Sequence, residues 1–216
     1  MGILKQGILG GFSGKVANVV GSSWKGIAVI KAKPLSVSNP QTAGQVAQRT
    51  KFSNSVAFAK EILSSVIKPL WDRFASQQSG FNAFISENID LFAAANPSPL
   101  ADLVISTGKM ASTTIDSAVF DISDDELTIG WTNDAGSGFK LDSDVPFIVV
   151  VNSTDSEVFG FDRTGVEDRS DGEVVLAGSV LGNLGSGDTA QVYLAFRRSD
   201  GTIVSDTGTS VITVQA

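Results

Sequence analysis

Short apolar runs separated by turn-forming residues fill the second half of the chain, and this pattern limits the fold most narrowly. After residue 100, apolar side chains recur at every second position, as in strands with one buried face. Clusters of Gly, Asp, Ser and Asn, such as residues 134–138, separate the runs. We predict seven strands, at residues 115–122, 127–132, 147–152, 157–161, 173–176, 191–197 and 211–214. This spacing predicts an antiparallel immunoglobulin- or fibronectin-like β-sandwich.

Three positions refine the predicted sandwich. Trp131 is expected in the core between the two sheets, and Tyr193 lies on a late strand, where such folds keep a buried tyrosine. Asp200-Gly201 is predicted to form the turn between the last two strands.

The first forty residues predict a β-hairpin. Residues 14–20 alternate, Gly21-Ser22-Ser23 supplies the turn, and residues 24–33 form the second strand, which Pro34 ends. An isolated two-stranded hairpin is marginally stable in water. We therefore expect it to pack on the following helices or on a neighbouring subunit.

Two helices are predicted next. Thr42 and Gln45 have the spacing of a capping box, and Pro69 is expected to kink the first helix near Ser65. The apolar stripe of this helix consists of Phe52, Val56, Ala59, Leu63, Val66, Leu70 and Phe74. A second, shorter helix presents Phe81, Phe84, Ile85 and Phe92 and ends before Asn96.

Residues 96–99 (Asn-Pro-Ser-Pro) have the composition of a stiff exposed linker. We therefore predict an α+β protein with a hairpin-plus-helices assembly module at 1–97 and a β-sandwich domain at 98–216.

The absence of His and Cys from the 216 residues excludes most hydrolytic mechanisms. Ser-His-Asp, Cys-His and HExxH sites cannot form, and neither can a zinc–thiolate site or a disulfide. We predict no enzymatic activity and no cofactor. No apolar run reaches the roughly 18–20 residues that cross a bilayer, and the Gly-rich start lacks the apolar segment of a secretory signal. These features predict a cytoplasmically made chain with no membrane partner.

Charge is distributed unevenly. Residues 1–100 carry ten Lys/Arg and four Asp/Glu, whereas residues 101–216 carry six and nineteen, for a net charge of −7. One interpretation is two solvated faces of opposite bias. The other is that the basic half of one copy faces the acidic half of the next. The lysines are scattered and no nucleic-acid-binding module accompanies them, which does not favour a nucleic-acid partner.

Several motifs resemble functional sites incompletely. Residues 10–15 (Gly-Gly-Phe-Ser-Gly-Lys) lack the first Gly and the final Ser or Thr of a phosphate loop, and fit better a flexible segment that another chain can approach. Residues 22–25 have a Ser-x-x-Lys spacing without the partner motifs of penicillin-recognising enzymes.

Other residue groups leave two interpretations open. Three acidic groups could bind Ca²⁺ or be simply solvated: Asp124-Asp125-Glu126, Asp142 with Asp144, and Asp168 with Asp171 and Glu173. Trp24, Trp71 and Trp131 favour core anchors over a sugar-binding platform, with an exposed Trp24 as the exception to test.

Two N-terminal segments resemble an uncharacterised domain family that is frequent in Bacteroidota genomes and their phages. Residues 14–26 read GKVANVVGSSWKG, and residues 39–49 read NPQTAGQVAQR, followed by Phe52. Family members usually read Asn-Pro-Arg-Thr-Pro-Ala-Gln in the second segment, whereas this chain has Gln41 and Ala43-Gly44.

The likeness extends along the chain through residues 80–84 (GFNAF), Asn88, and residues 193–196 with Asp200-Gly201 behind them. It implies a helical middle and a C-terminal sandwich, and no activity or catalytic residue. Similar signatures in phage-encoded structural proteins imply a virion or filament component.

We therefore predict a non-catalytic structural protein that self-assembles, with other copies of itself and other virion proteins as partners. Its expected location is a virion or extracellular assembly, or otherwise the cytoplasm. The alternative is a binding module whose sandwich recognises a glycan or surface protein. The predicted assembly contacts are Phe12, Lys15, Val16, Val19, Trp24, Lys25, Ile27, Val29, Asn39 and Arg49.

Overall fold

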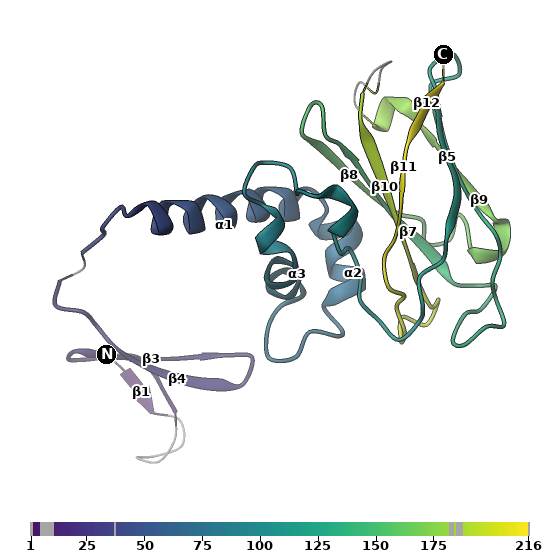
Figure 1. The fold of residues 1–216 in the computed structure, drawn as a ribbon. Helices are drawn as coiled ribbons and strands as arrows, with labels where there is room; N and C mark the ends of the chain where they lie inside the picture. The colour runs from purple at the N-terminus through teal and green to yellow at the C-terminus, as the bar shows by residue number, and fades with distance from the viewer. Residues whose placement is uncertain (1, 5–10, 37, 182–183, 185–187, 216) are drawn as a thin grey trace. The chain divides into compact units, whose positions relative to one another are not determined.

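The computed structural model describes residues 2–4, 11–36, 38–181, 184 and 188–215 (Figure 1). The chain forms two compact units. The N-terminal unit comprises Met1–Val46 with Ser76–Gln78, and the sandwich unit comprises Ala47–Ala75 with Ser79–Ala216. Among the described residues, no helix is both long enough and apolar enough to span a bilayer.

The N-terminal unit contains a four-stranded antiparallel sheet with its strands in chain order. The strands are β1 (Gly2–Leu4), β2 (Phe12–Val16), β3 (Val19–Trp24) and β4 (Ile27–Ala32). Lys25-Gly26 connects β3 to β4 with φ values of 45° and 84°. Positive φ at both residues matches the type I′ turn of a tight hairpin.

The predicted turn at Gly21-Ser22-Ser23 is wrong, because these residues lie inside β3. Gly21 pairs with Gly14 on β2 and with Ile30 on β4. Its lack of a side chain makes room for Phe12, since an added Cβ would lie 2.6 Å from the Phe12 ring. A glycine inside a strand here allows close packing within the sheet. The structure therefore has a four-stranded sheet where the sequence predicted a two-stranded hairpin.

The sandwich unit contains two four-stranded sheets, with strand orders β11-β10-β7-β8 and β12-β5-β6-β9. The strands are β5 (Ile115–Asp121), β6 (Glu126–Trp131), β7 (Val145–Asn152), β8 (Glu157–Asp162), β9 (Glu173–Ala177), β10 (Ala190–Arg197), β11 (Gly208–Val211) and β12 (Thr213–Gln215). The immunoglobulin/fibronectin-like sandwich is confirmed. Trp131 lies in the core between the sheets, as predicted.

The last predicted strand, 211–214, is divided between the two sheets. β11 pairs antiparallel with β10, whereas β12 pairs parallel with β5 on the opposite sheet. The division falls at Ile212, whose buried side chain packs in the core between the sheets. The strand therefore closes one side of the sandwich.

The predicted interruption of the first helix is confirmed. Helix α1 (Ala43–Glu61) is followed by a π-helical turn, η2 (Leu63–Ile67), and by α2 (Lys68–Trp71), which contains Pro69. The Ile67 amide donates to the Ile62 carbonyl at 3.0 Å, five residues back. At the start of α1, Gln45 N donates to Thr42 Oγ1 at 3.4 Å, as the capping-box spacing predicts. Two residues of the predicted apolar stripe, Phe52 and Phe74, are instead exposed.

The remaining helical segments are short. They are α3 (Gly80–Asn88) and the 3₁₀ turns η3 (Ile89–Leu91), η4 (Leu100–Asp102), η5 (Arg169–Asp171) and η6 (Gly178–Val180).

Strands β7 and β10 are buried on both faces, so the sandwich unit has three layers (Figure 1). Phe147 and Val149 pack against helical residues such as Ile62, whereas Ile148 and Val150 pack against the second sheet. Two cores therefore share one sheet. Figure 1 shows the helices on the outer side of that sheet.

The compact units differ from the predicted division at residue 97, because the helices and the sandwich share a core. Buried Tyr193 faces the helices and donates a hydrogen bond to the Leu100 carbonyl at 2.6 Å. Asn96 Nδ2 donates to the Ser153 carbonyl at 2.9 Å. The Pro-rich segment is thus a packed connection, although its composition is that of a linker.

Candidate functional site

One face of the N-terminal sheet gathers several predicted assembly contacts. Trp24 pairs with Ile27, and Ser22 pairs with Val29. Because side chains alternate along a strand, Trp24, Ile27 and Val29 project from the same face. Lys15 and Lys31 flank Val20 on this face. Trp24 is 56% exposed and Val29 is 41% exposed. The core-anchor interpretation is therefore wrong for Trp24.

The opposite face of this sheet is also apolar. It presents Val16 and Val19, which pair with each other, and the half-buried Phe12. Ile30, which is 63% exposed, belongs to this face and was missed among the predicted contacts. The strand register could have identified Ile30 as a contact. With the turn at Lys25-Gly26, Ile30 lies on the face opposite Val29.

The other predicted contacts lie away from these two faces. Lys25 occupies the β3–β4 turn, and Asn39 precedes α1. Arg49 lies on α1 within the sandwich unit. All three side chains are exposed. The Gly-rich segment that resembled a phosphate loop begins at Gly10, which lies outside the described residues.

The N-terminal sheet lacks a hydrophobic core among its described residues. Between residues 11 and 57 of the described chain, only Gly21 and Ser55 are buried, and both apolar cores begin at Phe58 or later. Met1–Val46 carries five lysines and no acidic residue, and the first acidic residue of the chain is Glu61. This unit is therefore an exposed, basic sheet with apolar side chains on both faces.

A pocket of about 390 Å³ opens in the sandwich unit between α1 and β8. Helix α1 contributes Asn54, Ala57, Phe58 and Glu61, and the region around β8 contributes Ala95, Ser156, Glu157, Val158 and Phe159. Sequence reasoning missed this pocket because its walls come from segments about a hundred residues apart, which only the tertiary fold brings together.

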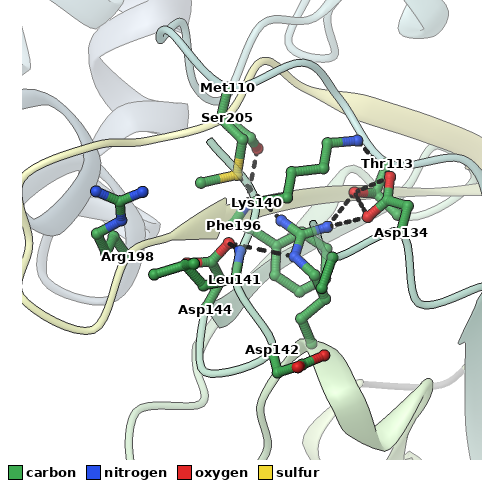
Figure 2. A network of polar contacts seen from close by, with 12 residues as sticks. Met110, Thr113, Asp134, Lys140, Leu141, Asp142, Asp144, Phe196, Arg198 and Ser205 are labelled. Carbon is green, nitrogen blue, oxygen red and sulfur yellow. Dashed lines mark hydrogen bonds and ion pairs between the residues drawn. The ribbon is translucent and has the colours of Figure 1, made fainter. Parts of the chain in front are cut away.

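A buried ionic cluster ties together the loops at one end of the sandwich (Figure 2). The Arg169 side chain is fully buried; its Nε donates to Asp144 Oδ2 at 3.2 Å and its Nη1 to Asp134 Oδ1 at 2.5 Å. Its guanidinium carbon lies 3.9 Å from the centre of the Phe196 ring. Lys140 forms an ion pair with Asp134 as well. Charge-assisted bonds of this kind compensate the desolvation of a buried cation.

Local turn chemistry positions Arg169 for these contacts. Asp168 and Asp171 form a capping box around the short η5 turn. The Arg169 amide donates to the Asp144 carbonyl at 2.8 Å, and Trp131 Nε1 donates to the Arg169 carbonyl at 3.0 Å. These bonds join the turn to the sandwich core.

Two of the groups whose pKa is shifted in the sandwich unit are Asp134 and Tyr193. Burial acts to raise the pKa of Asp134, but the hydrogen bond from Lys140 and the charge of Arg169 outweigh it, so the pKa lies below its ordinary value. Burial raises the pKa of Tyr193 well above its ordinary value. Tyr193 therefore remains a hydrogen-bond donor, and Asp134 remains an anion.

Two of the three predicted acidic groups, Asp142 with Asp144 and Asp168 with Asp171, have structural partners. Asp144 binds Arg169, Asp142 accepts a hydrogen bond from Asn133 at 2.8 Å, and Asp168 caps η5. Within the described part of the chain, no three His, Cys, Asp or Glu residues form a group that could hold a metal ion. The geometry of these carboxylates is that of loop-fixing contacts.

Comparison with known protein families identifies the family of this chain. The model of a family of unknown function (DUF6266) matches residues 11–210. The chain belongs to this family. That membership confirms an uncharacterised family, as the N-terminal motifs implied.

Two further comparisons add little to the family assignment. A crystal structure of the FN1–FN3 domains of chicken CNTN1 is similar at 17% identity and a TM-score of 0.37, and the match covers 50% of this chain and 33% of the chicken chain. The comparison with curated proteins found no match.

Proposed function

We propose that this DUF6266 member is a non-catalytic structural protein that self-assembles through its N-terminal sheet. One observation carries the proposal: the sheet exposes apolar side chains on both faces and, as far as its side chains are described, has no core of its own. A sheet becomes stable by packing an apolar face against another layer. Contiguous exposed apolar side chains on a soluble protein mark interaction sites.

The exposed side chains are large enough to support a specific contact. Burying an apolar side chain of this size completely contributes about 1.5–3 kcal/mol. Trp24, Ile27 and Val29 are each roughly half exposed, so each contributes up to about half that amount on association. Because about 1.4 kcal/mol corresponds to a tenfold change in Kd, the three together tighten binding by at most about two to three powers of ten before the entropy of association is subtracted.

Charge supports a contact between unlike regions of two copies. The N-terminal unit is wholly basic, whereas the remainder of the chain carries all 23 acidic residues. Contacts between unlike surfaces are heterologous, and they close into rings or continue as filaments. We propose a phage virion, tube or filament as the assembly, with other virion proteins as further partners. The motif resemblance supports that setting.

Light scattering and negative-stain microscopy of the full-length protein test this function. We expect rings, tubes or filaments. The double variant Trp24→Glu/Ile27→Asp is expected to be a folded monomer, because it places charges on the apolar face. Val166→Glu is the matched control, because Val166 is also an exposed apolar residue, at 64%, but lies in the sandwich unit.

Deletion of residues 1–33 gives a second test. Because both apolar cores begin at Phe58 or later, we expect a soluble, folded chain that does not assemble. A full-length protein that remains monomeric at high concentration, or a deletion variant that still assembles, would contradict the proposal.

The second candidate function is a binding module that recognises a glycan or surface protein. The pocket between α1 and β8 favours it, since its volume falls within the range of small-ligand sites, about 300–1,000 Å³. Saturable binding on a glycan array by a monomeric full-length protein would favour this function over assembly.

A further inference from the structure

The pocket in the sandwich unit lies along an open sheet edge. Strand β8 is the outermost strand of its sheet and pairs only with β7 among the described strands. An edge strand presents unpaired backbone donors and acceptors that can pair with another strand. The face of β8 at Gly160 is closed, since an added Cβ there would lie 2.7 Å from Ser65 Oγ on η2.

The pocket extends around this edge. Val158 packs with the core beneath the helices, and Phe159 packs with the core between the two sheets, so their side chains lie on opposite faces of β8. Both residues line the pocket. A ligand in the pocket therefore approaches the edge of β8 and the side of α1 together.

The lining combines apolar surface with negative charge. Ala57, Phe58 and Val158 are apolar, whereas Glu61 and Glu157 are exposed carboxylates. None of the lining residues is Lys or Arg. The site is therefore suited to an extended, apolar segment that carries positive charge.

Strand β4 of the same protein has these properties. It reads Ile-Ala-Val-Ile-Lys-Ala, is exposed at every position, and is the outer strand of the N-terminal sheet. Lys31 lies within it and Lys33 follows it, while the whole N-terminal unit lacks acidic residues. β4 and β8 have equal lengths of six residues.

We propose that β4 of a second copy pairs with the open edge of β8 beside α1, with Lys31 and Lys33 near Glu61 and Glu157. This inference rests on the proposed function and names its contact. Main-chain hydrogen bonds join the two sheets, as in other strand-addition complexes. Each copy then offers one strand and one acceptor edge, so the contact is heterologous and propagates. Salt weakens it by screening the exposed charges.

Cross-linking between copies tests the contact directly, because the chain contains no cysteine. We would mix the Val29→Cys variant with the Ala57→Cys variant and add a short bismaleimide. Cross-linked dimers are expected from the mixture and not from either variant alone. The matched control replaces Ala57→Cys with Ala177→Cys, an exposed alanine on β9, and is expected to give no dimer.

Charge reversal gives an independent test. Glu157→Lys is expected to raise the protein concentration at half-assembly roughly tenfold, because it places like charges together. Lys31→Glu is expected to have the same effect, and the double variant Lys31→Glu/Glu157→Lys to restore assembly. Glu173→Lys changes an exposed glutamate at the start of β9 and serves as the control.

The outcomes separate this inference from the proposed function. If the full-length protein assembles, but the cross-link is absent and Glu157→Lys assembles normally, the β4–β8 contact is wrong and self-assembly stands. A full-length protein that remains monomeric, including one that binds a small ligand in the pocket, overturns both. Cross-linking in the mixture together with rescue by the double charge swap supports both.

Discussion

Strands β4 and β7 have similar apolar sequences but opposite environments. β4 (Ile27–Ala32) is exposed at all six positions, whereas β7 (Val145–Asn152) is buried at all eight. β7 lies between the helices and the second sheet, so each face meets an apolar layer. Among the described residues, β4 belongs to a sheet with no covering layer of its own. The difference shows that an apolar strand sequence favours burial, but that the strand is buried only where other elements pack against its faces.

Charged residues differ between the two units in the same way. The sandwich unit buries Arg169 and pairs it with Asp144 and Asp134, so this buried cation is matched by carboxylates of the same unit. The N-terminal unit carries lysines with no acidic residue beside them in sequence. In the proposed assembly, a second copy supplies both the apolar layer and the negative charge.

Replacing Arg169 by Leu is expected to have the largest effect on the stability of the sandwich unit. The substitution leaves the fully buried Asp144 without its cation, which costs about 3–5 kcal/mol. Urea unfolding followed by tryptophan fluorescence measures the loss. Lys51→Met removes an ion pair with the exposed Asp90 and should cost at most about 1 kcal/mol. Equal losses in the two variants would show that the buried cluster does not stabilise this unit.

Val149→Ala tests the doubly packed strand. Val149 is fully buried against the helices, and removing two buried methyl groups costs about 1.6 kcal/mol, plus a cavity term. Thermal unfolding by circular dichroism measures the change. A loss below about 0.5 kcal/mol would show that the helical layer is loosely packed on β7.

Asp134→Asn tests the pH dependence of the ionic cluster. Because the folded pKa of Asp134 lies below its ordinary value, its contribution is complete above about pH 4 and is lost as the pH falls through the folded pKa. We expect the variant to be less stable at pH 7 and the difference to narrow below about pH 4. Urea unfolding from pH 7 to pH 2 measures it, with Asp124→Asn as an exposed control.

Val29→Ala is expected to have the smallest effect on stability. It is the same substitution as in β7, but at a side chain that is 41% exposed, so the unfolding free energy of the sandwich unit should change by less than about 0.5 kcal/mol. Assembly, measured by light scattering, is expected to weaken. A loss of unfolding free energy equal to that of Val149→Ala would show that β4 is as tightly packed as β7, and would contradict the proposed difference between the two strands.

Features with a local cause were predictable from the sequence. The strands of the sandwich follow from alternation and turn residues, and the helix interruption follows from Pro69. The sequence predictions were wrong where one residue type is found in two different structural settings. Gly21 has turn chemistry but lies in a strand beneath Phe12, and Asn96 has linker chemistry but binds the Ser153 carbonyl.

The candidate site was predictable only in part. Trp24, Ile27 and Val29 were identified from their motif, and their register then placed them on one face. The pocket beside β8 gave no sequence signal, because Ala57 and Val158 are distant along the chain. The Arg169 cluster was invisible for the same reason: Thr113, Asp134 and Asp144 reach the guanidinium from separate loops.

The sequence by itself determined where the strands of the sandwich form and where the first helix is interrupted, which chemistries are impossible without His and Cys, and that the basic and acidic residues are separated along the chain. These properties depend on backbone preferences and side-chain identity. Only the tertiary structure decided that β7 is covered on both faces and that β4 is exposed. Burial depends on which distant segments meet, and that is settled by the packing of the whole unit.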